Sequence, residues 1–519
     1  MDGFGNAALS GVKRFYFIGI YGVSVSSLAI ICARRGYTVS GSDTGEGTEE
    51  RRRGLENAKI TVRRGNSPQN LPSEASPSEV AVVYTAAITE DNAELSEARR
   101  RGMRIYSRAE LMELITGDIP LRIGIAGTHG KSTVCGMVSE IFLAAGLDPD
   151  VLCGAELPSV GGAFRIGSGE RVIYEACEYK NFFLRLRPSC AVVTNIEEDH
   201  LDFFKDIGEI RESFFTYADG SEVAVIGIDG ADGRIIAERL KGRCAPDGES
   251  EGNHDAVPWA CETEVNSVRR DEENEGGVAE ADGVRRMEGE TGSGLRVTAS
   301  VGKRIVTCSA ADHSADYYAR GVTVENGRYS FDICRRGEYV CRVALRVVGA
   351  HNLQNAITAA ATALENGVSP CFVAKGLSDF TGVRRRMEYR GSLNGAVIYD
   401  DYAHHPTEIR ATLAAARAMG FRFICCAFQP HTFSRTAKLF CDFVTAFADA
   451  DEVVFADVYA AREKNTYGVT SRELATATKN GYYLPTPELI AQHFRNIAAP
   501  GVLLLTMGAG ELDRVADMI

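Results

Sequence analysis

The sequence predicts an α/β protein with three domains, at residues 1–118, 119–381 and 382–519. Three observations lead to this prediction. Short buried strands alternate with helical segments along the chain, which is typical of sheets covered by helices. The length of 519 residues corresponds to about three domains at the usual ~150 residues each. Several strands end in glycine or polar residues, and α/β sheets bind their ligands at such strand ends.

Composition narrows the class of protein. Hydrophobic residues make up 45% of the chain, enough for several cores, and the net charge of −13 argues against a nucleic-acid partner. Most of the excess acid lies between residues 247 and 290, where 14 Asp or Glu stand against 4 Arg. This stretch is too polar to bury a core, so we expect a disordered or loosely ordered insertion at about 245–300. It holds the one tryptophan, Trp259, so an inert loop and an interaction patch both stay open.

Cysteine usage and hydropathy indicate the cellular compartment in which the protein is expected. The 14 cysteines form no CxxC pair, and some, such as Cys425 and Cys426, lie inside apolar strands, which is typical of reduced core thiols. No apolar run approaches the ~18 residues of a membrane span, and the N-terminal residues lack the order of a signal peptide. We therefore expect a cytoplasmic protein without a membrane partner.

The first domain has the order of a Rossmann-type nucleotide site: strand, glycine loop, helix, strand and acid. A buried strand at 14–20 leads through a loop into a helix near Leu28, and the next strand ends in an acid. The candidate binding residues follow the two strands: Gly19, Gly22, Ser42 and Asp43. The glycine pattern is incomplete at Tyr21 and Ser24, so a plain βαβ unit without a ligand stays an alternative.

The second domain opens with a strong phosphate-binding signal. A strand at 121–126 precedes a glycine-rich loop and an apolar helix, so backbone N–H groups and the helix dipole would face an anion. Lys131 would reach the outer phosphates and Ser132 would hold Mg²⁺. Ile125 occupies the position of the first glycine in the common P-loop, so this loop is shorter. The loop residues are Gly127, Thr128, His129, Gly130, Lys131, Ser132 and Thr133.

Acidic strand ends should lie beside this loop. One strand runs into Glu175 and Glu178, and another ends in Asn-Ile-Glu-Glu-Asp-His at 195–200. Because Mg²⁺ prefers hard oxygen ligands next to phosphate, we expect a magnesium ligand among these acids. A solvated strand end remains the alternative for any one of them.

Two polar features flank the start of the third domain. Asn352 and Asn355 lie one turn apart on one face of a predicted helix, where they could contact a ligand or simply cap the helix. The basic run at 384–386 follows at the domain border. It could bind the phosphates of a nucleotide or remain a solvated run of charge.

The third domain is predicted to be another α/β sheet with polar strand ends. Its expected strands lie at 396–401, 422–428, 452–458 and 502–506. The first ends in Asp400 and Asp401, and His404 and His405 follow. Adjacent histidines rarely face one site and zinc ligands usually have wider spacing, so a metal centre is the less favoured interpretation.

Together these motifs resemble those of the Mur ligases of peptidoglycan synthesis, and most of all the alanine-adding branch of that family. In order they are Gly-Thr-His-Gly-Lys-Ser-Thr, Glu-Ala-Cys-Glu, Asn-Ile-Glu-Glu-Asp-His, His-Asn-x-x-Asn, Arg-Arg-Met-Glu, Asp-Asp-Tyr-Ala-His-His-Pro-Thr-Glu and Gln-Pro-His-Thr-Phe-Ser-Arg-Thr. The resemblance covers about residues 15–510 apart from the acidic insertion. It implies a Rossmann-like UDP-sugar domain, a central P-loop-type ATPase domain and a Rossmann-like C-terminal domain for the amino acid.

The resemblance also implies an ATP-dependent ligase that requires Mg²⁺. ATP would phosphorylate the lactyl carboxylate of UDP-N-acetylmuramate, and the amine of L-alanine would attack the acyl phosphate. The implied catalytic residues are Lys131, Glu178, His200 and Arg386. The implied metal ligands are Ser132, Glu178 and His200. ATP would contact the glycine-rich loop together with Asn352, Asn355, Arg386 and Asp401. The alanine pocket would contain His405, His431 and Arg435. We expect a monomer or weak homodimer.

Three other interpretations stay open. A recycling ligase of the same family would add a whole tripeptide to the UDP-sugar and would need a roomier pocket near His431. A sensor that kept the fold would bind the UDP-sugar without hydrolysing ATP. A generic P-loop kinase is disfavoured by the short loop.

Overall fold

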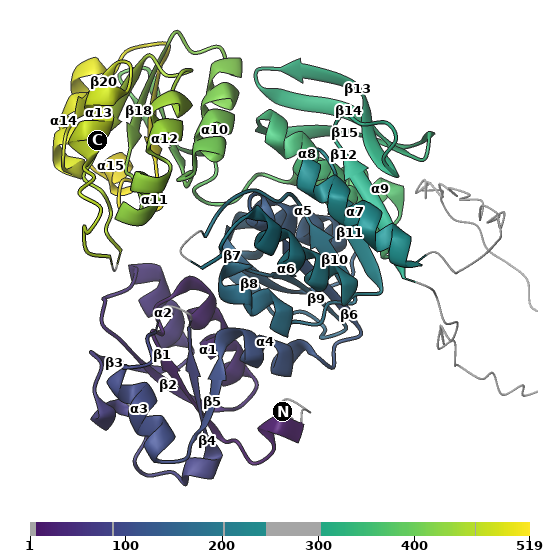
Figure 1. Cartoon of the computed structure of the whole chain (residues 1–519), viewed down its shortest axis with the longest axis vertical. Helices are drawn as coiled ribbons and strands as arrows, with labels where there is room; N and C mark the ends of the chain where they lie inside the picture. Colours follow the sequence, from purple (N-terminus) through teal and green to yellow (C-terminus); the bar gives the residue numbers. More distant parts are fainter. Residues whose placement is uncertain (1–6, 86–87, 201–202, 245–302, 462) are drawn as a thin grey trace, which may run out of the picture.

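The computed structural model describes residues 7–85, 88–200, 203–244, 303–461 and 463–519. In this part of the chain, three sheets with their helices follow one another along the sequence. Figure 1 shows them as a purple-to-blue body, a blue-to-teal body and a green-to-yellow body. The predicted α/β architecture in three parts is therefore confirmed, while the domain boundaries stay predictions. The expected acidic insertion at 245–300, with Trp259, lies outside the described residues.

The first sheet is fully parallel, in the order β3-β2-β1-β4-β5. Its strands are β1 (Arg14–Ile18), β2 (Thr38–Asp43), β3 (Thr61–Arg64), β4 (Val80–Tyr84) and β5 (Arg104–Ser107). Its helices are α1 (Val23–Arg34), α2 (Glu49–Asn57), α3 (Ala93–Arg100) and α4 (Arg108–Thr116). Strand order reverses at β1, which has β2 on one side and β4 on the other. The carboxyl end of β1 is therefore the place where such a sheet leaves a ligand crevice.

The second sheet has ten strands in the order β15-β14-β13-β12-β11-β10-β6-β9-β7-β8. They are β6 (Leu121–Ala126), β7 (Asp150–Leu157), β8 (Gly162–Arg165), β9 (Arg171–Glu175), β10 (Cys190–Val193), β11 (Val223–Gly227), β12 (Arg304–Ser309), β13 (Tyr317–Glu325), β14 (Arg328–Arg335) and β15 (Glu338–Val348). The strands from β13 to β7 in this order run parallel, whereas β8 pairs antiparallel with β7 and β14 pairs antiparallel with both β13 and β15.

Helices cover both faces of this sheet, so its central strands are buried throughout, as parallel strands usually are. The helices are α5 (Lys131–Ala144), α6 (Ile207–Asp219), α7 (Ala231–Cys244), α8 (Ala350–Glu365) and α9 (Pro370–Asp379). Ile123 and Ile125 of β6 pack in one apolar cluster with Met137 and Ile141 of α5. The apolar spacing of the α5 segment therefore fixes the helix directly behind the glycine-rich loop.

The third sheet has the order β16-β17-β21-β18-β19-β20 and is parallel except for the edge strand β16. Its strands are β16 (Glu388–Leu393), β17 (Ala396–Asp401), β18 (Phe423–Phe428), β19 (Glu452–Phe455), β20 (Gly481–Tyr483) and β21 (Val502–Met507). Its helices are α10 (Pro406–Ala418), α11 (Phe433–Lys438), α12 (Phe440–Ala446), α13 (Ser471–Ala477), α14 (Pro487–Ile497) and α15 (Arg514–Asp517). Cys425 and Cys426 are buried free thiols on opposite faces of β18, as strand alternation requires.

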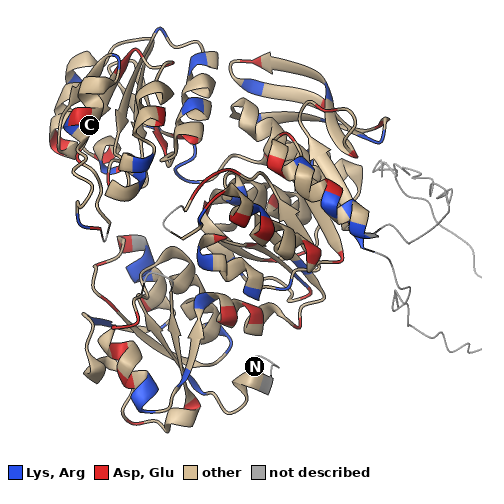
Figure 2. Ribbon diagram, viewed as in Figure 1, with Lys and Arg blue, Asp and Glu red and all other residues tan. Residues whose placement is uncertain are grey.

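Charged side chains of both signs are spread over the helices of all three bodies (Figure 2). Within the described ranges, every helix is too short or too polar to pass through a bilayer.

Candidate functional site

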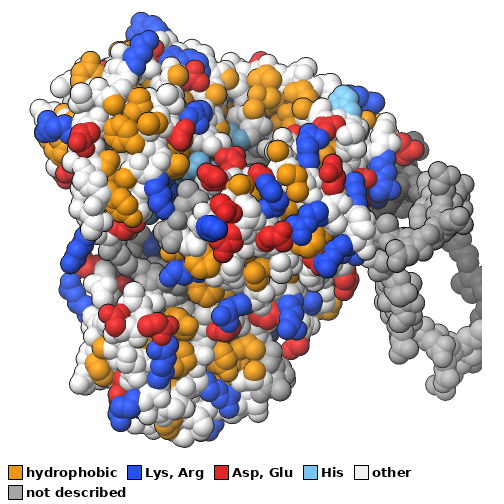
Figure 3. Space-filling view, in the orientation of Figure 1, with side chains coloured by type: hydrophobic (Ala, Val, Ile, Leu, Met, Phe, Trp, Pro, Cys, Tyr) orange, Lys and Arg blue, Asp and Glu red, His pale blue; other side chains and the backbone are white. Residues whose placement is uncertain are grey.

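Strand ends of all three sheets border one large cleft of about 1710 Å³. Gly19 follows β1, Lys131 opens α5 and Gly510 follows β21, and all three line this cleft. The space-filling view shows a hollow at the left, between the N-terminal body below and the C-terminal body above (Figure 3). Two smaller pockets open from the cleft, one sharing His129 with it and the other sharing Asp199.

The glycine-rich loop is held against the end of β10. Gly127 has φ +139° and Gly130 has φ +81°, conformations that other residues adopt only with strain. A Cβ atom at Gly130 would collide with the side-chain oxygen of Asn355 on α8. Asn195 accepts a hydrogen bond from the backbone N–H of His129 at 2.8 Å. The loop conformation thus depends on neighbours from β10 and α8.

Lys131 and Glu178 meet inside the loop. Lys131 Nζ donates to the carbonyl oxygens of Gly127 and Thr128 at 2.5 and 3.0 Å, and to Glu178 Oε1 at 3.1 Å. Burial by itself would lower the pKa of Lys131, but the facing Glu178 raises it above its usual value. The lysine is therefore a fixed cation at the point where the outer phosphates of a bound nucleotide would lie.

Hard oxygen donors surround this cation. Ser132 Oγ donates to Glu175 Oε2 at 2.8 Å, and His200 Nε2 lies 3.7 Å from Glu178 Oε1. The second carboxylate oxygen of Glu178 is buried and makes no hydrogen bond within the described part of the chain. A hydroxyl and two carboxylates, one of which has an unpartnered oxygen, form a donor set that fits Mg²⁺. The sequence-predicted residues Lys131, Ser132, Glu178 and His200 are thus brought together.

Asn352 and Asn355 line a pocket of about 150 Å³ beside the loop, together with His129, Arg386 and Asp401. Asn355 donates to Asn352 Oδ1 at 3.2 Å, and Asn352 donates to the carbonyl of Val348 at 2.8 Å. Neither amide is the N-cap of α8, since that position is Gly349. The capping alternative for this pair is therefore wrong.

Asp401 closes the far side of this pocket. It accepts hydrogen bonds from the backbone N–H groups of Met387 and Ala403 at 2.7 and 2.8 Å. Burial raises the pKa of Asp401 to about 6 although Arg386 lowers it. Asp401 therefore holds the backbone on both sides of the first two strands of the third sheet, at Met387 before β16 and at Ala403 after β17.

Glu408 is a central residue that the sequence analysis did not single out. Its carboxylate accepts from Arg386 Nη1 at 3.2 Å and lies 3.2 Å from His129 Nδ1. Burial would raise the pKa of Glu408, but the cations around it hold it well below its usual value. Glu408 lies in the first turn of α10, directly after Pro406 and Thr407. An acid at this helix start is the sequence feature from which the residue could have been predicted.

Glu197 provides a second acid at the loop. Its Oε2 accepts from Thr407 Oγ1 at 2.8 Å and lies 3.6 Å from His129 Nε2. Burial disfavours the imidazolium of His129, yet Glu197 and Glu408 together raise its pKa to about 9. His129 is consequently a cation that joins the second sheet to the third.

A pocket of about 250 Å³ contains His431 and Arg435, the two residues that the resemblance implies for the amino acid, together with Asp199 and His200. Arg435 donates to Asp199 Oδ1 at 3.2 Å, across the boundary between the second and third sheets. Burial and the nearby Arg435 lower the pKa of His431 to about 4, so its ring is neutral at pH 7.

His405 does not line this pocket. Its Nδ1 accepts from the N–H of Thr407 at the start of α10, and its ring lies 5.2 Å from that of His129. Its neighbour His404 is nearer to the pocket, with its ring 5.9 Å from that of His431. The structure thus groups His405 with the glycine-rich loop rather than with Arg435.

The four residues predicted in the first sheet all line the large cleft: Gly19, Gly22, Ser42 and Asp43. Asp43 accepts from the backbone N–H of Tyr21 at 2.9 Å and so holds the loop after β1. Ser42 is buried and donates to Glu94 at 2.5 Å. Tyr21 is thereby tied into the loop at the place where the sequence lacks a glycine.

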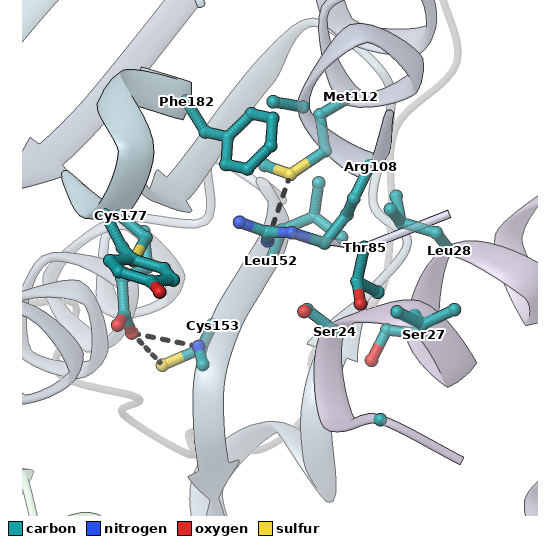
Figure 4. A pocket seen from close by; sticks show the side chains of 16 residues that line it. Ser24, Ser27, Leu28, Thr85, Arg108, Met112, Leu152, Cys153, Cys177 and Phe182 are labelled. Atoms are coloured by element: carbon teal, nitrogen blue, oxygen red, sulfur yellow. Dashed lines mark hydrogen bonds between the residues drawn. The ribbon is translucent and has the colours of Figure 1, made fainter. Parts of the chain in front are cut away.

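A further pocket of about 350 Å³ lies between α1 and α4 of the first sheet and β7 and β9 of the second. In Figure 4, Arg108 extends from α4 toward the sulfur of Met112, which lies 3.6 Å from its Nη1 atom. Cys153 and the backbone N–H of Gly154 both donate to Glu175 Oε2. Because Glu175 also lines the large cleft, the two spaces meet at the acids beside Ser132.

Strained backbone occurs at the cleft as well as elsewhere in the described part of the chain. Non-glycine residues with positive φ include several that line it or its side pockets: His200, Arg385, Met387 and Thr432. Such conformations cost about 1–3 kcal/mol each and persist where the surroundings hold them, commonly at functional sites.

Comparison with known proteins gives the family that the sequence matches. Three family models match, described as "Mur ligase family, catalytic domain" (residues 14–118), "Mur ligase middle domain" (125–256) and "Mur ligase, glutamate ligase domain" (385–510). The UDP-N-acetylmuramate–L-alanine ligase of Agathobacter rectalis is 36% identical over 509 residues, which is 97% of each chain. That of Acetivibrio thermocellus is 36% identical over 511 residues, 98% of this chain and 95% of the relative.

Solved structures agree in fold. A UDP-N-acetylmuramate–alanine ligase from Thermotoga maritima superposes with a TM-score of 0.71 at 22% identity, covering 97% of both chains. A murein peptide ligase from Psychrobacter arcticus gives a TM-score of 0.66 at 20% identity, again over 97% of both.

Proposed function

The chain belongs to the Mur ligase family, and we propose from this premise that it joins L-alanine to UDP-N-acetylmuramate in an ATP-driven step of peptidoglycan precursor synthesis. The observation that carries the proposal is the pairing of two sites in one cleft. The loop with Lys131 lies beside Glu178 and His200, and the pocket of Arg435 opens next to the same histidine.

In the proposed reaction, a lactyl carboxylate oxygen attacks the γ-phosphorus of ATP and ADP leaves. Lys131 then balances charge on the transferring phosphoryl group, since its ammonium already lies among the loop carbonyls. Phosphoryl transfer needs positioning and charge stabilisation more than covalent help from the protein. Arg386 supplies a second cation, provided that the phosphates draw it away from Glu408.

Mg²⁺ is the proposed metal, and Ser132, Glu178 and His200 would hold it. When bound, it would neutralise phosphate charge and align the γ-phosphoryl group. Glu175 keeps the hydroxyl of Ser132 oriented through their 2.8 Å hydrogen bond. The unpartnered oxygen of Glu178 is the chain's own support for this assignment.

The nucleotide's base and ribose are proposed to lie in the pocket of Asn352, Asn355 and Asp401. The two amides offer donors and acceptors at a buried helix face. The loop from Gly127 to Thr133 would hold the phosphates, and His129 would link them to α10.

L-Alanine is proposed to bind with its carboxylate on Arg435. A guanidinium recognises a carboxylate through charge-assisted hydrogen bonds. The neutral ring of His431 can accept a hydrogen bond from the substrate's ammonium group. Once the ammonium has lost a proton to solvent, the amine attacks the acyl phosphate carbon. Inorganic phosphate then leaves, and a second amine proton is released as the amide forms. His405 is proposed to support the loop rather than the alanine.

The UDP-sugar is proposed to lie along the end of β1, where Gly19 and Gly22 allow close approach and Asp43 orders the loop. The domain at 1–118 would then bind the UDP-sugar, the domain at 119–381 ATP, and the domain at 382–519 L-alanine. A cytoplasmic monomer or weak homodimer completes the proposal, in keeping with an ATP substrate and with the free thiols among the described residues.

The experiment that tests this proposal measures phosphate release from ATP and UDP-N-acetylmuramate, with L-alanine, glycine, L-serine or the tripeptide added separately. We expect release that depends on L-alanine, on the UDP-sugar and on Mg²⁺, and that stops when the metal is chelated. Release with the tripeptide alone would assign the chain to the recycling ligases. No release with any acceptor would contradict a catalytic role.

A further inference from the structure

Three metal-ligating side chains meet at the amino-terminal edge of the third sheet. Cys425 of β18, Glu452 at the start of β19 and His493 of α14 each offer one ligand atom, and these atoms lie within 4.8 Å of one another. Cys425 Sγ is 3.3 Å and His493 Nε2 is 2.5 Å from the same Glu452 oxygen. The three residues are called the Cys425 cluster below.

The fold places these residues together for simple reasons. Cys425 and Glu452 are register partners on neighbouring parallel strands, so their side chains point to the same face. Helix α14 packs on that face through Ile490, Ala491 and Phe494. His493 lies one turn after Ile490, and its ring therefore reaches the strand edge.

The cluster lies away from the proposed catalytic cleft. Glu452 is the first residue of β19, whereas the cleft and its side pockets border the opposite, carboxyl ends of the strands. In Figure 1 the elements involved, β18 and α14, lie in the C-terminal body. An ion bound here would tie three elements of the third sheet together without touching the substrates.

We propose that the Cys425 cluster binds a divalent transition-metal ion with the preferences of zinc. A thiolate, an imidazole and a carboxylate are ligands that Zn²⁺ accepts in tetrahedral sites. Bonds of about 2.0–2.3 Å place such ligand atoms roughly 3.3–3.8 Å apart. The Cys425–Glu452 spacing of 3.3 Å already has this value, and His493 and Glu452 would need to separate by about 1 Å.

An ion can reach the cluster and complete its coordination. The side chains of His493 and Glu452 are 28% and 16% exposed, so solvent reaches the outer side of the cluster while Cys425 closes the inner side. Water would supply the fourth ligand. On binding, the S–H bond of Cys425 breaks, its proton leaves to solvent and an S–metal bond forms, with no change in oxidation state.

The experiment uses the full-length protein, reduced, freed of metal with a chelator and titrated with Co²⁺ as a spectroscopic substitute for zinc. We expect a thiolate-to-cobalt charge-transfer band that saturates at one ion per chain and disappears when Zn²⁺ is added. The band should be lost in Cys425→Ser. It should persist in Cys371→Ser, which removes an exposed thiol outside the cluster.

His493→Gln provides a second variant that does not disturb the buried core. Its Zn²⁺ affinity, measured by competition with a chelating dye, should fall at least about 100-fold, since even loss of a hydrogen-bond partner to a ligand typically costs 10–100-fold. Zinc should raise the melting temperature of the parent protein and not of this variant. A cobalt band unchanged in Cys425→Ser, or no thiolate band at all, would overturn the proposal and leave a histidine–glutamate hydrogen bond beside a buried thiol.

Discussion

Arg386 and Glu408 face each other beside the glycine-rich loop, with Nη1 of the guanidinium 3.2 Å from Oε1 of the carboxylate. Both groups are largely buried, with side chains 30% and 9% exposed. The cation proposed to bind the nucleotide phosphates is therefore neutralised by an acid before the nucleotide arrives. Phosphate binding would exchange one anionic partner of Arg386 for another.

Glu408→Gln should destabilise the protein. The change leaves the cations Arg386 and His129 beside a neutral amide, and breaking a buried ion pair costs about 3–5 kcal/mol. Denaturant unfolding would measure the loss. Glu238→Gln, at an exposed position on α7, is the matched control and should stay within about 0.5 kcal/mol of the parent. Equal stability of the two variants would show that the Arg386–Glu408 pair contributes nothing to the free energy of unfolding.

The contribution of His129 to stability should depend on pH. Its pKa in the folded protein, about 9, lies above the usual 6.5. A raised pKa stabilises the folded state fully below pH 6.5, and this stabilisation is lost as the pH rises through 9. The gap in unfolding free energy between the parent and His129→Gln should therefore shrink by up to about 3 kcal/mol between pH 6 and pH 9.5. A gap that stays constant over this range would mean that folding does not shift the pKa of His129.

Lys131→Ala should abolish most phosphate release. The ammonium is the cation nearest the proposed transferring group, and removing such a charge-stabilising donor typically lowers kcat by about 10²–10³. Lys375→Ala, which breaks an exposed pair with Asp379 on α9, should leave kcat unchanged. Comparable turnover in the two variants would remove Lys131 from the proposed mechanism.

Gly130→Ala should weaken ATP binding by more than backbone strain explains. The new Cβ would meet the side chain of Asn355, so both the loop and the proposed ribose pocket must shift. Gly146→Ala is the control, because Gly146 also has positive φ, +70°, but has open space around it. The KM for ATP should rise at least about tenfold in the first variant only, whereas strain of about 1–2 kcal/mol is common to both.

Arg435→Lys should raise the KM for L-alanine while the KM for ATP stays near its parent value. Lysine keeps the charge but loses the planar pair of donors that suits a carboxylate. We expect an increase of about ten- to a hundredfold, corresponding to about 1.4–2.8 kcal/mol. Arg410→Lys, on the exposed side of α10, controls for general effects on the third sheet. A selective rise in the KM for ATP would instead assign Arg435 to the nucleotide.

Strand ends were the part of the site that could be predicted. Lys131, in the segment after β6, and Glu178, in the segment after β9, lie at the cleft because parallel strands end at one edge. The partners of these residues could not be predicted in the same way. Glu408 contacts His129 only after the second and third sheets have come together, and no local pattern encodes that approach.

The orientation of His405 also could not be predicted from local sequence, and the antiparallel strands give only weak sequence signals. Neighbouring histidines on a turn point in different directions, and only the start of α10 decides that His405 faces the loop while His404 faces His431. Of the antiparallel strands at the edge of the sheet, β15 alternates in exposure, whereas β13 is buried over its first three residues and exposed over the rest. Such mixed patterns are weaker signals than the continuous apolar runs that mark the central strands.

The continuity of the cleft with its two side pockets has a consequence for inhibitors. The nucleotide-side pocket and the pocket of Arg435 both open into the same space, sharing His129 and Asp199 with it respectively. A single molecule with an adenine-like group at one end and a carboxylate at the other could occupy both. Its second contact would then form at a local concentration fixed by the linker. Such bivalent ligands can exceed the affinity of either half by about 10²–10⁴.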